Sequence, residues 1–396
     1  MPLDEMHVEA PSPQPSTLKL FLAFLKLGAT AFGGPAMIAI IRALAVQTKR
    51  WLDEETFRSG VALCQTIPGA TAMQMSAYVG LRVRGIRGAT ASFIGFGLPA
   101  FILMLSLSAL YQQFHALSAV ASAFSGLRAL VVALVGYSVV SFGRAYLKKW
   151  QDFIIAPLAA LLLWIGLSPL LVILLAFLLG VGLRFKEARS PQEGRQTREP
   201  FPLRFVFGIL TAVALGLFAL FLLNRRLFDL SLLMLRIDLF AFGGGFASVP
   251  LMLREVVELH RWMGPKTFMD GIALGQVTPG PIVITATFVG YSVQGLLGAL
   301  VSTASIFLPS FILVIAVAPV FLRLNSLPLF RKGIDGILCS FVGLLASTAV
   351  RLGMSLAWDL PRAAIAAAAF IALMLRVNLL WIVFGVVILS LLIRLL

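Results

Sequence analysis

The stretch that decides the fold reads Leu235-Arg236-Ile237-Asp238-Leu239-Phe240-Ala241-Phe242-Gly243-Gly244-Gly245, and a second cluster, Gln276-Val277-Thr278-Pro279-Gly280-Pro281, follows it. Both clusters place glycine and proline, which interrupt helices, inside strongly apolar sequence. In hydrocarbon each unpaired backbone group costs several kcal/mol, so a broken helix persists only where protein or a water-filled cavity covers it. We therefore expect the two clusters to lie around a protected cavity.

The same two clusters occur once more near the N-terminus. Ala31-Phe32-Gly33-Gly34 matches residues 241–244, and Gln65-Thr66-Ile67-Pro68-Gly69 matches residues 276–280. The match extends to the glycines of 80–88 and 290–298 and to the Pro-x-Phe-Ile-Leu segments at 99–103 and 309–313. A duplicated pair of broken apolar segments is typical of a transporter whose binding site lies between two repeats.

The composition predicts an all-α polytopic membrane protein. The chain has 396 residues, of which 60% are hydrophobic and 12% charged, and its mean hydropathy is +0.98. Apolar runs long enough to cross about 30 Å of hydrocarbon recur from Leu18 to the C-terminus. The net charge of +15 comes from basic residues in short loops between these runs, which is the pattern that orients membrane proteins. We expect a lipid bilayer as a partner and no nucleic acid.

Cysteine and histidine usage predicts neither a disulfide framework nor a metal site. Cys64 and Cys339 lie in apolar segments, and His7, His115 and His260 are far apart in the sequence. We expect no cofactor.

The duplication divides the chain into four segments. Residues 1–16, acidic and then proline-rich, form a predicted disordered tail without the basic start of a signal peptide. Residues 17–184 form the first repeat, 185–226 a basic linker and a connector helix, and 227–396 the second repeat. Segment lengths predict about six spans per half plus the connector, about thirteen transmembrane helices in all.

The distribution of positive charge predicts that the two halves are inverted. In the first half the loops at 82–87 and 144–149 are basic, whereas 111–118 carries no Lys or Arg. In the second half the equivalent of 82–87 is uncharged, and the equivalent of 111–118 holds Arg323, Arg331 and Lys332. This exchange predicts an inverted repeat, a cytoplasmic N-terminus and a C-terminus outside. Arg225 and Arg226 then fall outside, as an exception to the rule.

The breaks suit a small oxyanion. Helices that restart after such breaks expose N–H groups that carry about half a positive charge and bind anions. Gln65 and Gln276 add amide donors and Thr278 a hydroxyl, whereas no cluster of carboxylates suits a cation. Glycine pairs also serve close helix packing, but their duplication beside Pro-Gly favours a binding site. The predicted substrate-binding residues are Phe32, Gly33, Gly34, Pro35, Gln65, Pro68, Gly69, Arg236, Phe242, Gly243, Gly244, Gly245, Gln276, Thr278, Pro279, Gly280 and Pro281.

Two cations are candidates for supporting the site. Lys26 precedes Gly33, and Arg236 precedes Gly243, by two helical turns, which is about 10 Å and places each cation on the face of its break. Arg236 could bind an oxyanion in bidentate fashion while Asp238 holds it. The alternative, left open, is that both cations extend to the membrane surface. Asp238, Glu255 and Asp270 are interpreted as interfacial or paired charges rather than proton carriers.

The sequence resembles the chromate ion transporter family in its long, two-domain form, from Leu18 to the C-terminus. The motifs that carry the resemblance are those at 32–35, 242–245, 278–281, 288–291 and 307–311. The resemblance implies a secondary transporter that exports chromate, recognised as a sulfate-like dianion, across the bacterial inner membrane and so confers chromate resistance. Two departures from the family pattern concern the anion: Ala70 stands where the family has proline after Pro68-Gly69, and Met37-Ile38 where many members have histidine.

Three alternatives stay open. A carrier for sulfate or another oxyanion, or a channel, would use the same motifs. A membrane-embedded enzyme is the remote alternative, because a Ser–His dyad needs a membrane-facing histidine and all three histidines lie in tails or loops. We expect no catalytic residues, and a homodimer stays open.

Overall fold

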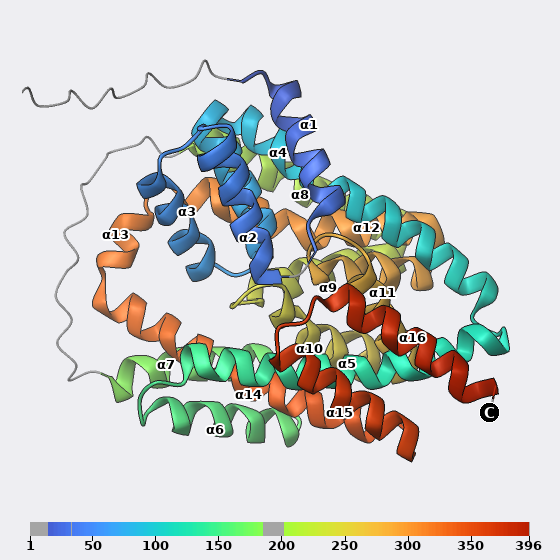
Figure 1. The fold of residues 1–396 in the computed structure, drawn as a ribbon. Helices are drawn as coiled ribbons and strands as arrows, with labels where there is room; N and C mark the ends of the chain where they lie inside the picture. Colours follow the sequence, from blue (N-terminus) through green and yellow to red (C-terminus); the bar gives the residue numbers. More distant parts are fainter. Residues whose placement is uncertain (1–14, 33, 185–201, 396) are drawn as a thin grey trace, which may run out of the picture.

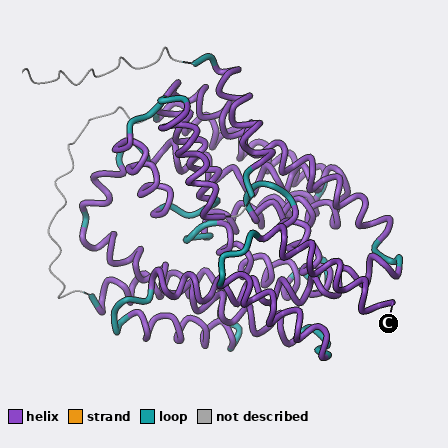
Figure 2. The backbone as a smooth tube through the Cα atoms, viewed as in Figure 1, coloured by secondary structure: helices purple, strands orange, loops and turns teal. Residues whose placement is uncertain are grey.

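The computed structural model describes residues 15–32, 34–184 and 202–395, and every regular element in these ranges is helical (Figures 1 and 2). Most of the predicted tail and of the predicted linker therefore lies outside the described residues. The first half contains α1 (Thr17–Thr30), α2 (Gly34–Arg42), η1 (Ala43–Thr48), α3 (Glu54–Thr66), α4 (Thr71–Phe114), α5 (Ser118–Tyr146), α6 (Asp152–Trp164) and α7 (Pro169–Leu183). The connector is α8 (Leu203–Leu223). The second half contains α9 (Arg225–Phe240), η2 (Gly245–Ala247), α10 (Ser248–Met252), η3 (Leu253–Leu259), α11 (Pro265–Val277), η4 (Ile282–Ile284), α12 (Thr285–Val317), α13 (Phe321–Ser326), α14 (Pro328–Met354), α15 (Leu360–Met374) and α16 (Leu379–Leu395).

Helices α4 and α12 each double back on themselves. The backbone leaves helical geometry at Arg84-Gly85 and at Gln294-Gly295, where both glycines have positive φ (60° and 57°), a conformation that glycine adopts without strain. After the turn the two arms pack closely, since a Cβ at Gly80 would lie only 2.2 Å from the carbonyl oxygen of Gly88. Each element is therefore a helical hairpin with a short first arm and a long second arm.

The Pro-Gly clusters lie at the turns of two further hairpins. Gly60 of α3 lies against the ring of Tyr78 in the short arm of α4, and Gly271 of α11 lies in the same way against the ring of Phe288 in α12. The chain between these contacts reverses at Pro68-Gly69 and at Pro279-Gly280, where both glycines again have positive φ (115° and 107°).

The duplication repeats unusual backbone features as well as sequence. Both η1 and η3 are π-helices, which are rare outside functional or irregular positions. Each is followed by an arginine with positive φ, Arg50 (49°) and Arg261 (51°). A tryptophan comes next in both halves, and its N–H bonds back to the π-helix, Trp51 to Ala45 O (2.8 Å) and Trp262 to Val256 O (2.9 Å).

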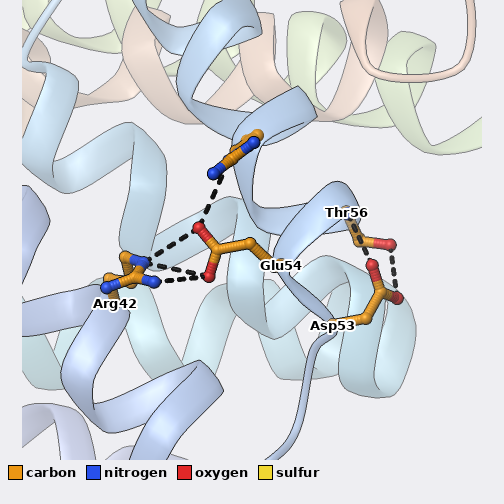
Figure 3. A network of polar contacts seen from close by, with 5 residues as sticks. Arg42, Asp53, Glu54 and Thr56 are labelled. Atoms are coloured by element: carbon orange, nitrogen blue, oxygen red, sulfur yellow. Dashed lines mark hydrogen bonds and ion pairs between the residues drawn. The ribbon is translucent and has the colours of Figure 1, made fainter.

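A polar network fixes the turn between η1 and α3 (Figure 3). The guanidinium of Arg42 donates to both carboxylate oxygens of Glu54, with Nη2–Oε2 at 2.7 Å, and this pairing holds the pKa of Glu54 below its usual value. Asp53 caps α3 by accepting the N–H of Thr56 at 2.7 Å, which lowers the pKa of Asp53. Asp53, Glu54 and Thr56 lie outside the apolar helices, and the network sets the start of the helix that leads to Gln65.

The two halves interlock at the centre by reciprocal backbone hydrogen bonds. The N–H of Gly69 donates to Ala241 O at 2.9 Å, and the N–H of Gly280 donates to Ala31 O at 2.9 Å. Each Pro-Gly turn therefore pairs with the helix break of the other half. The long helices exchange partners in the same manner, since α5 packs on α15 and α16 while α14 packs on α6 and α7.

Within the described residues five helices are long and apolar enough to cross a membrane, namely α4, α5, α8, α12 (counted with η4) and α14. The connector α8 has no buried residue, as expected of a helix that faces lipid. In Figure 1 the turn between α4 and α5 lies at the right edge of the molecule, whereas α13, which follows α12 in the equivalent place, lies at the left edge. The C-terminal end of α16 lies at the right edge.

Candidate anion-binding site

A cavity of about 330 Å³ lies where the breaks of the two halves meet. One wall is the break at Gly243, Gly244 and Gly245, and another is the turn that follows α11. The first half contributes α2, the end of α3 and the start of α4, and α5 closes the remaining side. The cavity is therefore shared between the halves, as the duplicated breaks predict.

The lining is mainly apolar, contains several neutral polar groups and carries no charge among the described residues. Its described side chains include hydroxyls and amides together with apolar groups, and none is a carboxylate or a cation. The polar members are Gln65, Thr71, Tyr137, Ser138, Ser141, Tyr146, Gln276 and Thr278. Hydroxyl and amide groups can donate to oxygen atoms of a ligand. The cavity thus suits an anion with several acceptor oxygens and does not suit a metal cation.

Gln276 provides the clearest donor. The residue is 9% exposed, it lines the cavity, and its Nε2 is buried without a hydrogen-bond partner among the described residues. A buried amide that makes no hydrogen bond costs about 1–3 kcal/mol. A ligand oxygen in the cavity would remove this cost.

The glycine break supplies backbone donors. Gly243 and Gly244 have positive φ (92° and 94°), and their N–H groups have no acceptor among the described residues. Thr71 Oγ1 lies 3.1 Å from where a Cβ would be at Gly244, so a larger residue there would crowd the cavity. The chain then continues as helix from Gly245 through η2, α10 and η3. Successive free N–H groups before a helix are a common anion-binding arrangement.

The structure brings many, but not all, of the sequence-predicted residues to the cavity. Those that line it are Gln65, Gly243, Gly244, Gly245, Gln276, Thr278, Gly280 and Pro281. Phe32, Pro68, Gly69, Phe242 and Pro279 lie in the breaks and turns behind the lining. Gly33 lies outside the described residues, and Gly34 and Pro35 begin α2. The hydroxyl of Thr278 donates to Gly275 O at 3.0 Å, so its proton is already engaged.

The two predicted cations do not line the cavity. Lys26 and Arg236 are both exposed and are absent from its lining. Asp238 does not hold Arg236, because its carboxylate is fully buried and accepts the N–H of Ser310 at 2.8 Å. Residues two apart on a helix point about 200° apart, which explains why the two side chains diverge.

Sequence patterns did not predict that α5 forms a wall of the cavity. Tyr137, Ser141 and Ala145 line the cavity at intervals of four residues. Residues four apart lie on one face of a helix, so this stripe of small and polar side chains in an apolar segment was the signal.

A partly buried ion pair holds the end of α4 and α5 to α11. Arg128 donates to both oxygens of Asp270, with Nε–Oδ1 at 2.7 Å, and the hydroxyl of Tyr111 donates to Asp270 Oδ2 at 2.7 Å. Asp270 is therefore the paired charge that the sequence interpretation expected.

An all-helical chain with duplicated breaks around a cavity shared by two halves defines a membrane transport protein. The profile of the family described as chromate transporter matches residues 18–181 and 228–391, and the chain belongs to that family.

Individual relatives agree over nearly the whole chain. An uncharacterized transporter of Methanocaldococcus jannaschii is 42% identical over 371 residues, covering 93% of this chain and 92% of the relative. Chromate transport proteins of Cupriavidus metallidurans and Pseudomonas aeruginosa are each 31% identical, over 355 residues (88% of this chain, 85% of the relative) and 392 residues (92% and 88%). No solved structure matches the chain significantly.

Proposed function

We propose that the protein is a secondary transporter that exports chromate from the cytoplasm across the inner membrane and thereby confers chromate resistance. The observation that carries the proposal is the uncharged, donor-lined cavity at the meeting of the two breaks, with the buried amide of Gln276 unpaired inside it. A tetrahedral oxyanion presents several acceptor oxygens to such a lining. Family membership and the relatives named chromate transport proteins support chromate as the anion.

The proposed ligands follow from the cavity. Gln276 and Gln65 would donate from opposite repeats, while the N–H groups of Gly243 and Gly244 would approach the anion from the break. The glycines admit the anion close to the backbone, since a Cβ at Gly244 would occupy space beside Thr71. A lining without a cation holds a dianion weakly, which favours its release after transport.

The membrane potential can drive export. A dianion that leaves a cell held negative inside gains about 4.6 kcal/mol per 100 mV, twice the 2.3 kcal/mol of one elementary charge. Import would require at least two accompanying cations to offset the same term.

We further propose an inverted arrangement with five complete crossings rather than about thirteen. The five long helices would cross, and the other apolar helices would pair as half-length hairpins; α6, with 13 residues, extends only about 20 Å. The first half would cross the membrane twice and the connector once. The second half would therefore begin on the opposite side of the membrane and have the inverted topology. The opposite positions of the α4–α5 turn and α13 in Figure 1 support this arrangement, as does the exchange of basic loops. It leaves the N-terminus in the cytoplasm and the C-terminus outside.

Cysteine accessibility tests the topology. Single cysteines at Arg84 and Arg331 should label from the cytoplasm, and one at Gln294 should label from outside. Labelling of positions 84 and 294 from the same side would show that the halves are parallel.

The transport proposal is tested with labelled chromate and inside-out vesicles, where export appears as uptake. We expect uptake that saturates with chromate and depends on the membrane potential, with sulfate as a competitor to define the preferred anion. Saturation distinguishes a carrier from a channel. Absence of chromate or sulfate flux in vesicles that contain the protein would contradict the proposal.

An enzymatic role has no support at the site. His115 and His260 are exposed and lie outside the cavity lining, and no group of three metal-binding side chains occurs in the described part of the chain. Replacing either histidine with alanine should leave chromate flux within twofold of wild type, a tolerance appropriate to surface positions.

A further inference from the structure

The two Pro-Gly turns cross the opposite breaks with the same backbone geometry, but among the described residues only the crossing at Gly69 has a serine and a carboxylate hydrogen-bonded next to the turn; we call it the polar crossing, and the one at Gly280 the apolar crossing. At the turn of the first half, Ala70 donates its N–H to Ser310 Oγ at 3.0 Å, and Ser310 donates its own N–H to Asp238 Oδ2 at 2.8 Å. At the turn of the second half the equivalents are Pro281, Ala100 and Gly28. These residues have no N–H, no hydroxyl and no carboxylate, respectively.

Asp238 is fully buried, and one of its oxygens has no partner. Its relative exposure is 0%, and Oδ1 makes no hydrogen bond within the described residues. An ionised carboxylate in such surroundings is stable only when a cation or several donors compensate its charge. Oδ2 accepts the N–H of Ser310 at 2.8 Å, and the hydroxyl of Ser310 and the N–H of Ala70 are the other donors near the carboxylate, all of them uncharged.

The surroundings supply no compensating cation. Helices α8, α10 and α12 pack on α9, yet α10 and α12 contain no charged residue, and α8 has only Arg204 at its start. The charged residues of α4 lie at its turn, at 82, 84 and 87. On α9 itself Arg225, Arg226 and Arg236 are exposed, and Asp229 pairs with Arg225. Among the described residues no charged side chain faces Asp238.

Asp238 lies directly behind the cavity wall. A Cβ at Gly69 would come within 3.1 Å of Asp238 Oδ2, and the next residue, Ala70, lines the cavity. The cavity lining contains no charge that would screen a carboxylate from a bound dianion. A negative charge at Asp238 and a dianion in the cavity would therefore repel each other across a single turn of backbone.

We propose that Asp238 is a proton-binding site, and that its neutral form is the one that admits the oxyanion. The step takes one proton from the aqueous cavity onto the carboxylate, with no other bond made or broken. Proton and dianion then bind with positive coupling, and by linkage each strengthens the affinity for the other. The inference rests on the proposed anion transport. It makes Asp238 a proton carrier, whereas the sequence interpretation treated Asp238 as an interfacial or paired charge.

The first test measures protons taken up when the purified wild-type protein binds chromate in weakly buffered detergent solution, with a protein-free titration as the blank. We expect uptake approaching one proton per bound chromate at alkaline pH, where the carboxylate would be ionised before binding. Chromate binding without proton uptake at any pH would overturn the inference and leave the transport proposal intact. Absence of chromate binding and of flux would instead overturn the transport proposal.

The second test compares Asp238→Asn with wild type. Asparagine keeps an oxygen for the Ser310 N–H but cannot ionise, so it mimics the neutral state. Wild-type half-saturation for chromate should rise with pH, toward a limit of about tenfold per pH unit for one required proton. In Asp238→Asn it should stay constant and proton uptake should disappear. Asp229→Asn, a partly exposed carboxylate on the same helix that pairs with Arg225, is the matched control and should behave as wild type.

A variant with unchanged pH dependence would overturn the assignment to Asp238. If Asp238→Asn does not insert, the wild-type proton measurement still decides whether a proton binds with the anion. Ser310→Ala then tests the position, because it removes the hydroxyl that links Ala70 to this site while it keeps the N–H donor to Asp238. We expect Ser310→Ala to shift the pH at which half-saturation rises; an identical pH profile would count against the linkage.

Discussion

The crossing at Gly69 and the crossing at Gly280 show what duplication preserved and what it did not. Both glycines have positive φ, and each donates its N–H to the carbonyl of the alanine that opens the opposite break, at 2.9 Å. Around Gly69, however, stand Ser310, Gln74 and Asp238, whereas Gly280 faces the methyl group of Ala100. Backbone hydrogen bonds therefore give the two crossings nearly the same geometry, and a few side chains make the two crossings chemically different.

The comparison explains why Ala70 replaces a proline. The N–H of Ala70 is a donor to Ser310, and proline has no N–H, so the polar crossing requires another residue at this position. At the apolar crossing the equivalent of Ser310 is Ala100, which has no hydroxyl to accept an N–H. Proline is therefore tolerated at position 281. The departure from the family pattern is thus part of the polar crossing rather than a change at the cavity alone.

The largest expected effect comes from crowding the polar crossing. In Gly69→Ala the new Cβ would lie 2.0 Å from Ser310 Oγ at a φ of 115°, whereas in Gly280→Ala it would lie 2.8 Å from Ala100 Cβ. Strain and overlap together should lower stability by about 3 kcal/mol for Gly69→Ala and about 2 kcal/mol for Gly280→Ala. Thermal unfolding in detergent and chromate flux measure both. Gly182→Ala, with open space around it, is the control, and equal losses at Gly69 and Gly182 would contradict the account.

The next effect separates the two glutamines of the cavity. Gln276→Ala removes a buried donor, and loss of a hydrogen bond to a charged ligand costs about 1.5–3 kcal/mol, or roughly ten- to hundredfold in half-saturation for chromate. Gln65→Ala should cost less, because Gln65 is exposed and water can replace it. Initial rates of uptake over a range of chromate concentrations give both values. A larger increase in half-saturation for Gln65→Ala than for Gln276→Ala would contradict the proposal that Gln276 is the stronger donor to the anion.

A smaller effect is expected at Arg236. A bidentate anion contact at Arg236, one of the two alternatives that the sequence left open, would mean that Arg236→Gln abolishes transport, whereas the structure leaves Arg236 exposed and away from the cavity lining. We now expect Arg236→Gln and Lys26→Gln each to change half-saturation for chromate by less than about twofold, the usual range for surface positions. Loss of transport in Arg236→Gln alone would restore the original prediction.

The smallest effect lies far from both crossings, at the cap of α3. Asp53→Ala should lower stability by about 1 kcal/mol without changing half-saturation for chromate. The cap lowers the pKa of Asp53, so its contribution is present above the ordinary value of 3.8 and is lost as pH falls through the lower folded value. Thermal unfolding of both proteins at neutral and at strongly acidic pH checks this. A difference that persists in acid would show that the carboxylate is not its source.

Sequence patterns located the helix breaks and eight of the 23 residues that line the cavity, because glycine and proline interrupt helices locally. They did not predict the pairing of Gly69 with Ala241 or of Gly280 with Ala31, since a repeat does not reveal which surfaces of its two copies meet. The stripe on α5 was present at Tyr137 and Ser141 but had no counterpart among the duplicated motifs. The spacing of Arg236 from Gly243 shows on which face of the helix the arginine lies. It does not show what that face contacts, which depends on how α9 packs.

The central claim is that the oxyanion binds between the two breaks, and a structure with chromate bound tests it most directly, since chromium scatters anomalously. We expect one chromium site inside the cavity, with oxygens within hydrogen-bond distance of Gln276 Nε2 and of the N–H groups of Gly243 and Gly244. A chromium site at Arg236 or Lys26, with the cavity lacking chromium, would contradict the account.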